Sequence, residues 1–131
     1  MPNVISAEIL TTGIKNEHLS SLKEWGQFLA QKAQARGDKK PMTTSQIRKF
    51  FGEIKRIQAD FENCKGEIVL LDPKIAYSVG RAKKEGPSKI EDFYKLVNPL
   101  LSGVMEDKSR FKNFVNVVEA IVAYHKAEGG Q

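Results

Sequence analysis

Cationic side chains at helical spacing are the part of this sequence that most clearly suggests a chemistry. At 100° per residue, the basic residues between 48 and 56 fall on one arc of a helix, and the apolar residues between 47 and 61 fall on the opposite arc. Gly52 and Ala59 lie among the basic residues, so a phosphate backbone could approach the helix closely there. The pattern indicates a surface for a polyanion, and its four cations are Arg48, Lys49, Lys55 and Arg56.

A second basic face is expected further along the chain. Lys74 and Arg81 are seven residues apart, nearly two helical turns, and they are flanked by Tyr77 and Lys84. Tyr77 could stack on a base or a ribose. If the two helices pack side by side, their basic faces merge into a groove that binds phosphates and reads little sequence. The alternative for either face alone is an ordinary solvated helix surface.

Residues suited to catalysis or metal binding are sparse. The chain has one cysteine, Cys64, and two histidines, His18 and His125, without zinc-type spacing. The motifs HExxH, Walker A and GxGxxG do not occur in it. We interpret His125 as a core histidine at a helix end, and we expect no enzyme activity, no cofactor and no metal.

Two further residues are ambiguous in the sequence. Trp25 either covers the helical bundle or contacts another subunit. Glu119 interrupts the apolar stretch 117–123, and we expect it to be buried with a partner such as an arginine or a tyrosine hydroxyl. A structural ion pair is favoured there over a catalytic acid, because no second titratable group is placed to work with it.

The composition bounds the class of protein. A chain of 131 residues, 40% hydrophobic and 28% charged, is about one globular domain. No apolar run approaches the roughly 18 residues of a membrane span, and the N-terminus does not resemble a signal peptide. The lone cysteine fits a reducing compartment, so we expect a cytoplasmic protein without membrane contact. The net charge of +5 is a moderate bias toward polyanions.

Helices must position the basic residues, because apolar periodicity runs through most of the chain. Thr43 with Gln46, and Ser88 with Glu91, have the spacing of capping boxes that begin helices. Asp107 begins the last helix, whose wide apolar face predicts a deep position in the bundle. The expected helices span residues 17–36, 43–63, 72–84, 88–104 and 107–129.

Two prolines bear on the helix boundaries. Asp72 caps the third helix with Pro73 at its first position, or that helix begins earlier with Pro73 in its first turn. Pro99 should kink the fourth helix without ending it, because the apolar register continues in phase across it. We therefore expect an all-α fold, a compact bundle of about five helices, with an N-terminal extension over 1–42 and a core over 43–131.

Three blocks of the sequence carry a resemblance to a known family. Residues 43–50 read Thr-Thr-Ser-Gln-Ile-Arg-Lys-Phe, residues 73–81 read Pro-Lys-Ile-Ala-Tyr-Ser-Val-Gly-Arg, and residues 119–126 read Glu-Ala-Ile-Val-Ala-Tyr-His-Lys. In this order and at this spacing, they resemble the small subunit of type III-A CRISPR effector (Csm) complexes. The resemblance covers about residues 43–127, whereas residues 1–42 match less clearly.

The resemblance implies a helical bundle that stacks in several copies along the duplex of guide RNA and target RNA. It implies contacts between basic side chains and the RNA backbone, partners among the other Csm subunits and further copies, and no nuclease activity in this subunit. On matching positions, Arg48, Lys49 and Arg56 would face RNA, with Lys74 and Arg81 as the second basic face. We therefore expect a non-catalytic RNA-binding assembly subunit that acts in antiviral defence.

Two other functions compete with this one. The first is a structural bundle whose basic faces meet acidic protein partners. The second is a DNA-binding regulator, which is disfavoured because a helix-turn-helix needs a short turn between its helices. The residues that we expect to contact RNA are Arg48, Lys49, Lys55, Arg56, Lys74, Tyr77, Arg81 and Lys84.

Overall fold

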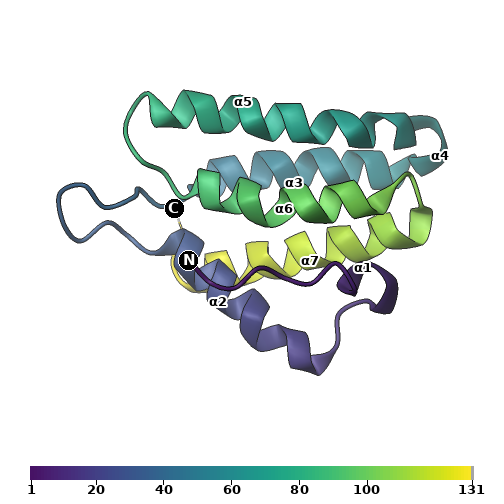
Figure 1. Ribbon diagram of the computed structural model, residues 1–131, viewed down its shortest axis with the longest axis horizontal. Coiled ribbons are helices and arrows are strands. Elements are labelled where there is room, and N and C mark those ends of the chain that lie inside the picture. The colour runs from purple at the N-terminus through teal and green to yellow at the C-terminus, as the bar shows by residue number, and fades with distance from the viewer. Residues whose placement is uncertain (131) are drawn as a thin grey trace.

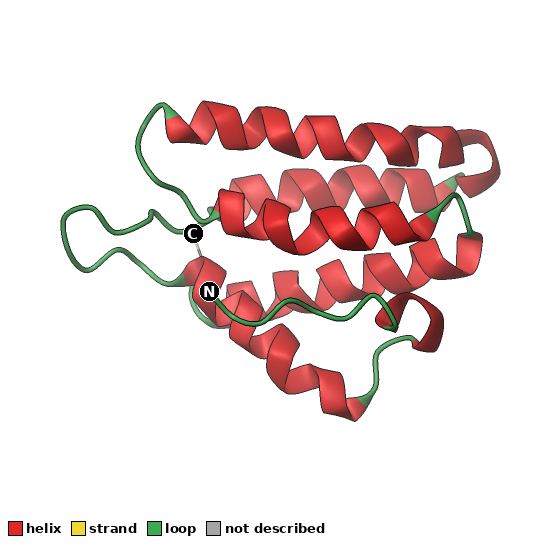
Figure 2. Cartoon of the chain, viewed as in Figure 1, coloured by secondary structure: helices red, strands yellow, loops and turns green. Residues whose placement is uncertain are grey.

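Five long helices make up most of the computed structural model, which describes residues 1–130 (Figure 1). They are α2 (Leu19–Ala30), α3 (Thr44–Ala59), α5 (Leu71–Lys83), α6 (Ile90–Val104) and α7 (Lys108–Ala127). Four short elements join them: α1 (Ile9–Thr12) and α4 (Phe61–Cys64), and the 3-10 helices η1 (Asn16–His18) and η2 (Lys65–Leu70). The described residues form no β-strand, so the predicted all-α class is confirmed (Figure 2).

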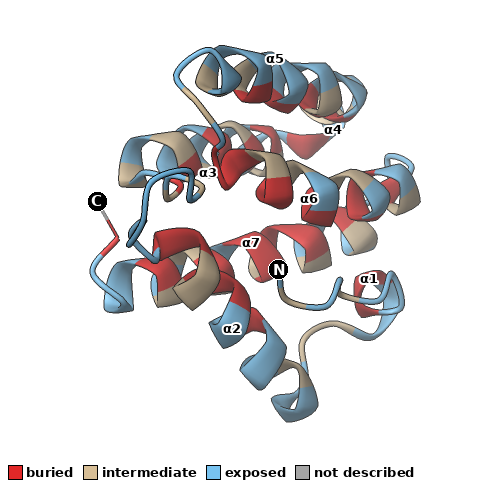
Figure 3. Ribbon diagram, turned by 60° about the vertical axis from the view of Figure 1, so that its left-hand side comes forward, coloured by how far each residue is buried: buried red, intermediate tan, exposed pale blue. Residues whose placement is uncertain are grey.

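Helix α7 lies at the centre of the bundle. Helices α1, α2, α3 and α6 all pack against it, whereas α5 packs outside, on α6 (Figure 1). The Asp107 carboxylate caps α7 by accepting a hydrogen bond from the Arg110 N–H at 2.9 Å. Phe111 and Phe114 of α7 are fully buried, and the buried faces of its neighbours turn toward it (Figure 3). The predicted deep position of the last helix is confirmed.

Helix α2 shares this core. Gly26 lies so close to α7 that a Cβ atom there would be 2.4 Å from the Tyr124 Cβ. Trp25 beside it is fully buried, and its indole N–H donates to the Asn3 carbonyl at 2.9 Å. Trp25 is therefore a core residue. The division of the chain at residues 42 and 43 into extension and core stays a prediction, although α2 and α7 pack as one unit.

Helix α2 ends at Ala30, earlier than the predicted end at residue 36. Residues distant in the sequence occupy the carbonyl groups that a longer helix would need. The Leu29 carbonyl accepts from the Met42 N–H at 2.8 Å, and Lys89 Nζ donates to two further carbonyls at 2.8 and 3.1 Å. The prediction was wrong because local periodicity carries no information about these partners.

The next two helices also differ from prediction at their ends. Helix α3 stops at Ala59, because Asp60 leaves the helical conformation with φ −138° and ψ 56°, and the short α4 follows. Helix α5 begins at Leu71, with Pro73 in its first turn, so the earlier of the two predicted starts is confirmed. Helix α6 runs unbroken through Pro99, whereas its kink stays a prediction.

Two predicted side-chain roles were wrong. Glu119 is exposed on α7 and needs no buried partner. Glu91 does not complete a capping box with Ser88, because its carboxylate pairs with Lys83 and Lys95 instead. His125, by contrast, is confirmed as a core histidine, with Nε2 at 2.7 Å from the Met42 carbonyl oxygen. None of the helices formed by residues 1–130 is long and apolar enough to cross a membrane.

Candidate nucleic-acid interface

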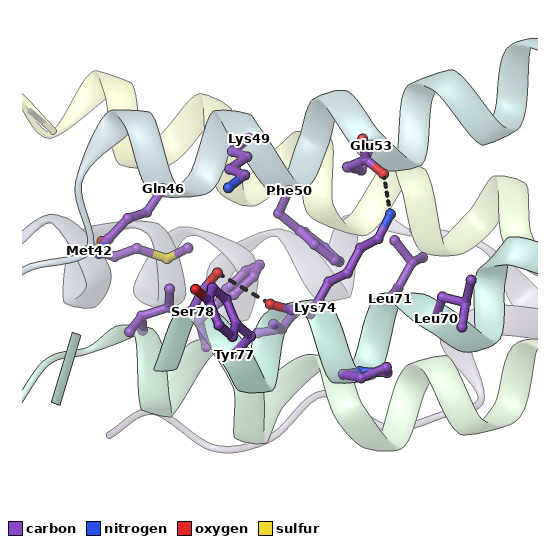
Figure 4. A pocket seen from close by; sticks show the side chains of 14 residues that line it. Met42, Gln46, Lys49, Phe50, Glu53, Leu70, Leu71, Lys74, Tyr77 and Ser78 are labelled. Carbon is purple, nitrogen blue, oxygen red and sulfur yellow. Dashed lines mark hydrogen bonds and ion pairs between the residues drawn. The ribbon is translucent and has the colours of Figure 1, made fainter. Parts of the chain in front are cut away.

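Helices α3 and α5 run antiparallel on one side of the bundle, as the turn through α4 and η2 requires (Figure 1). A groove separates them, because α3 packs on α7 while α5 packs on α6. Lys74 Nζ of α5 reaches across this groove and donates to the Glu53 carboxylate of α3 at 2.9 Å (Figure 4). The two helices that carry the predicted basic faces are therefore neighbours.

The start of α3 is fixed by the predicted capping box. The Gln46 N–H donates to Thr43 Oγ1 at 3.1 Å, and the Thr43 N–H donates to Gln46 Oε1 at 2.8 Å. The apolar arc faces the core as predicted, and its buried residues are Ile47, Phe50, Ile54 and Ile57. The cap and this buried arc together fix which way the basic arc of α3 points.

The basic arc of α3 divides into two flanks. Lys49 lines the groove, and Arg56, two turns further on, is on the same flank because its guanidinium pairs with Glu53 at 3.3 Å. Arg48 and Lys55 lie on the outer flank, and the Lys55 ammonium is 5.9 Å from the centre of the Phe51 ring. The four cations are all exposed, as predicted, but they do not all face α5.

Helix α5 supplies the other wall of the groove. Lys74, Tyr77 and Ser78 line it, and Arg81 follows Lys74 by about two turns on the same flank. Arg81 and Lys84 are exposed and form no ion pair among residues 1–130. Tyr77 is 68% exposed, which is unusual for a large aromatic side chain.

Two carboxylates that the sequence reasoning missed neutralise the middle of the groove. Glu53 accepts from Lys74 and Arg56, and Glu67 of η2 accepts from Arg56 at 2.6 Å. The Lys74 hydrogen bond holds the pKa of Glu53 below its ordinary value, and the Arg56 guanidinium does the same for the pKa of Glu67. The spacing of Glu53 three residues before Arg56 was a usable signal, whereas nothing local linked Arg56 to Glu67.

The floor of the groove is apolar. It is a cavity of about 520 Å³ with the side chains of Phe50, Ile75 and Phe93 in its walls. Polar and charged groups lie at its mouth, where Figure 4 shows Lys49, Tyr77 and Ser78 around the opening. The arrangement can thus bind an anion at its rim and an apolar or flat group in its interior. Residues 1–130 contain no group of three histidine, cysteine or acidic side chains placed to hold a metal.

Comparison with known proteins identifies one family. The family model described as Csm2 Type III-A matches residues 20–131. The match begins in α2, so it takes in both walls of the groove and the central helix α7. No curated protein and no solved structure matches the chain.

Proposed function

The chain belongs to the Csm2 Type III-A family, and from this premise we infer that it is the RNA-contacting small subunit of its complex. Membership makes it a structural subunit of the type III-A CRISPR Csm complex, with the other Csm subunits as partners. We propose that it has no catalytic activity and contacts the backbone of the guide–target duplex. Several copies would stack along that duplex in antiviral defence.

The observation that carries this proposal is the side-by-side placement of α3 and α5. Cations from both helices border one groove on one side of the bundle. Two unrelated solvated helix faces would have no reason to lie next to each other in this way. Lys49 and Arg81 have no carboxylate partner among residues 1–130, so they are available to phosphates. Arg48, Lys55 and Lys84 extend the basic surface beyond the groove. Such contacts position RNA without reading its sequence.

Arg56 and Lys74 contribute differently, because both are already paired with carboxylates. RNA phosphates would compete with Glu53 and Glu67 for these two cations. A single copy can contact only a short stretch of RNA backbone, and we expect it to bind RNA weakly in isolation. Stacked copies gain affinity through multivalency, because each further contact along the same duplex is intramolecular.

The experiment that tests this function uses the assembled Csm complex. A complex carrying Arg48→Ala with Arg81→Ala should bind target RNA less tightly than the unaltered complex. Its affinity should also fall less steeply with salt, because fewer counterions are released from the RNA. The matched control is Lys23→Ala with Lys112→Ala, which removes two exposed cations of α2 and α7. Equal affinities and salt slopes for the two double variants would exclude RNA binding at this surface.

A purely structural role predicts a different result. If the basic faces met acidic protein surfaces, treating the native complex with ribonuclease would leave its subunit contacts intact. If they bind RNA, the same treatment should release this subunit or loosen its attachment.

A further inference from the structure

We propose that the groove between α3 and α5 holds a single unpaired RNA base, stacked against Tyr77, while the surrounding cations bind the adjacent phosphates. This inference rests on the proposed RNA-binding function and goes beyond backbone contact. Phosphates bind at the charged rim of the groove, and the base would occupy the apolar cavity below that rim.

The size and the walls of the cavity suit a flat aromatic ligand. Its volume of about 520 Å³ lies within the roughly 300–1,000 Å³ of typical small-molecule pockets. It opens to solvent between two helices, and the apolar surface that it offers comes mainly from the exposed side chains of Leu70, Pro73 and Tyr77, over a base of buried phenylalanine and isoleucine. Because α3 and α5 do not pack closely on each other, the space between them stays open except where the Lys74 side chain crosses it to Glu53.

Tyr77 is the natural stacking partner at the mouth. The residue is 68% exposed at the edge of an apolar cavity, so burial in the bundle does not account for its aromatic side chain. Aromatic side chains beside cationic ones are the usual platform for single-stranded nucleic acid, because every base has a stackable face. Lys74 lines the groove beside Tyr77 (Figure 4), and Arg81 follows Lys74 by about two helical turns, so both cations can reach phosphates that flank the base.

Polar groups at the mouth can bind the edge of a base. Gln46 uses Oε1 to accept from Thr43, which leaves its amide N–H groups free to donate among the described residues. Ser78 Oγ donates to the Lys74 carbonyl at 3.3 Å and can still accept a hydrogen bond. Lys49 lines the same opening without an ion-pair partner in residues 1–130. A base in the cavity would thus meet both donors and acceptors.

Charge decides between a base and an apolar side chain of a neighbouring protein as the occupant. An apolar side chain of a neighbouring protein would fill the cavity but would bring no charge of its own, so Lys49 and Arg81 would need separate acidic residues. An RNA nucleotide satisfies both features, since its base is apolar on its faces and its phosphates are anionic. The base must be unpaired, because a base within a duplex cannot leave its stack without unpairing.

Photocrosslinking locates such a base directly. Target RNAs carrying 4-thiouridine at successive positions would be bound to the assembled complex, irradiated and digested with trypsin. Cleavage after Lys49, Lys55, Lys74 and Arg81 releases the groove walls as peptides 50–55 and 75–81. We expect RNA crosslinks on these two peptides at a subset of target positions.

Matched variants test whether the groove itself holds the base. Ser78→Phe fills the mouth without changing charge and should lower the crosslink yield about tenfold. Ala76→Phe, on the exposed side of the same helix and outside the groove, should leave the yield unchanged. Tyr77→Ala should lower the yield and Tyr77→Phe should preserve it, because the phenyl ring still stacks.

Two outcomes would overturn the base site. In the first, crosslinks appear only on other peptides, while the salt slope of RNA binding still changes in the Arg48→Ala, Arg81→Ala complex. That result would reject the base site but not the phosphate contacts. In the second, the Ser78→Phe variant does not assemble into the complex, and the unaltered complex gives no RNA crosslink on peptides 50–55 and 75–81. That result would mean that a neighbouring subunit occupies the groove. If the salt slope does not respond either, the proposed function itself fails.

Discussion

Lys74 of α5 and Glu53 of α3 form an ion pair that spans the groove, with 2.9 Å between Nζ and Oε2. The same carboxylate accepts from Arg56, one turn further along α3, at 3.3 Å. The pair therefore joins two helices whose backbones do not pack closely. Together with Glu67, which pairs with Arg56, it leaves the middle of the groove nearly neutral, so the unpaired cations at the groove itself are Lys49 and Arg81.

Removing the Glu53 charge should strengthen RNA binding. In Glu53→Gln, Lys74 and Arg56 lose a competing anion, so the assembled complex should bind target RNA several-fold more tightly and with a steeper salt dependence. Filter binding over a range of salt concentrations measures both. Glu119→Gln makes the same change in net charge at an exposed site on α7 and should have little effect. Weaker binding by Glu53→Gln would instead mean that the pair positions Lys74 for RNA.

Acid should destabilise the fold through three carboxylates. Hydrogen bonds from Lys74, Arg56 and Lys83 hold the pKa values of Glu53, Glu67 and Glu91 below the ordinary value of 4.5. The folded state thus binds fewer protons than the unfolded state around pH 4, so these pairs stabilise the fold above pH 4.5.

That stabilisation should be lost as the pH falls below 4.5 through the lowered folded pKa values. Urea unfolding at pH 6 and at pH 3.5 measures the loss, which should be modest because these ion pairs are partly exposed. Glu91→Gln removes one pair and should show a smaller difference between the two pH values. An equal difference in both proteins would exclude a contribution from Glu91.

The same substitution should have opposite effects at two glycines. Gly26→Ala places a methyl group 2.4 Å from the Tyr124 Cβ and 2.8 Å from the His125 backbone nitrogen, so it should destabilise the fold by about 1–3 kcal/mol. Gly52 lies in the exposed part of α3 with open space around its Cβ position. Gly52→Ala should therefore stabilise the fold by about 0.5–1 kcal/mol. Denaturant unfolding measures the change in the free energy of unfolding for both variants. If Gly26→Ala leaves that free energy unchanged, α2 and α7 can move apart to make room for the methyl group.

The sequence predicted the fold where local signals decide it. The capping box at Thr43 and the cap at Asp107 form as predicted, because their hydrogen bonds join residues three apart. The apolar arcs also face the core as predicted, because side chains three and four residues apart lie on the same face of a helix. The end of α2 could not be predicted, because Met42 and Lys89 take over its carbonyls and only the tertiary fold brings them there.

The candidate site was predictable to a similar extent. Periodicity found both basic faces, but only the three-dimensional arrangement shows that Lys49 faces α5 while Arg48 faces away. Glu67 escaped notice because η2 brings it to Arg56 from 11 positions away in the sequence. Glu119 was misassigned because apolar neighbours on a helix do not by themselves bury the residue among them.

The burial of Trp25 gives the chain an intrinsic fluorescent reporter. It is the sole tryptophan, fully buried, hydrogen-bonded to Asn3 and in edge contact with the Phe28 ring at 5.9 Å between centroids. Its emission should therefore shift to longer wavelength when α2 separates from α7 and water reaches the indole. Because α2 packs on α7 while α5 packs on α6, this signal follows the separation of α2 from α7 without a label and apart from events at α5 (Figure 1).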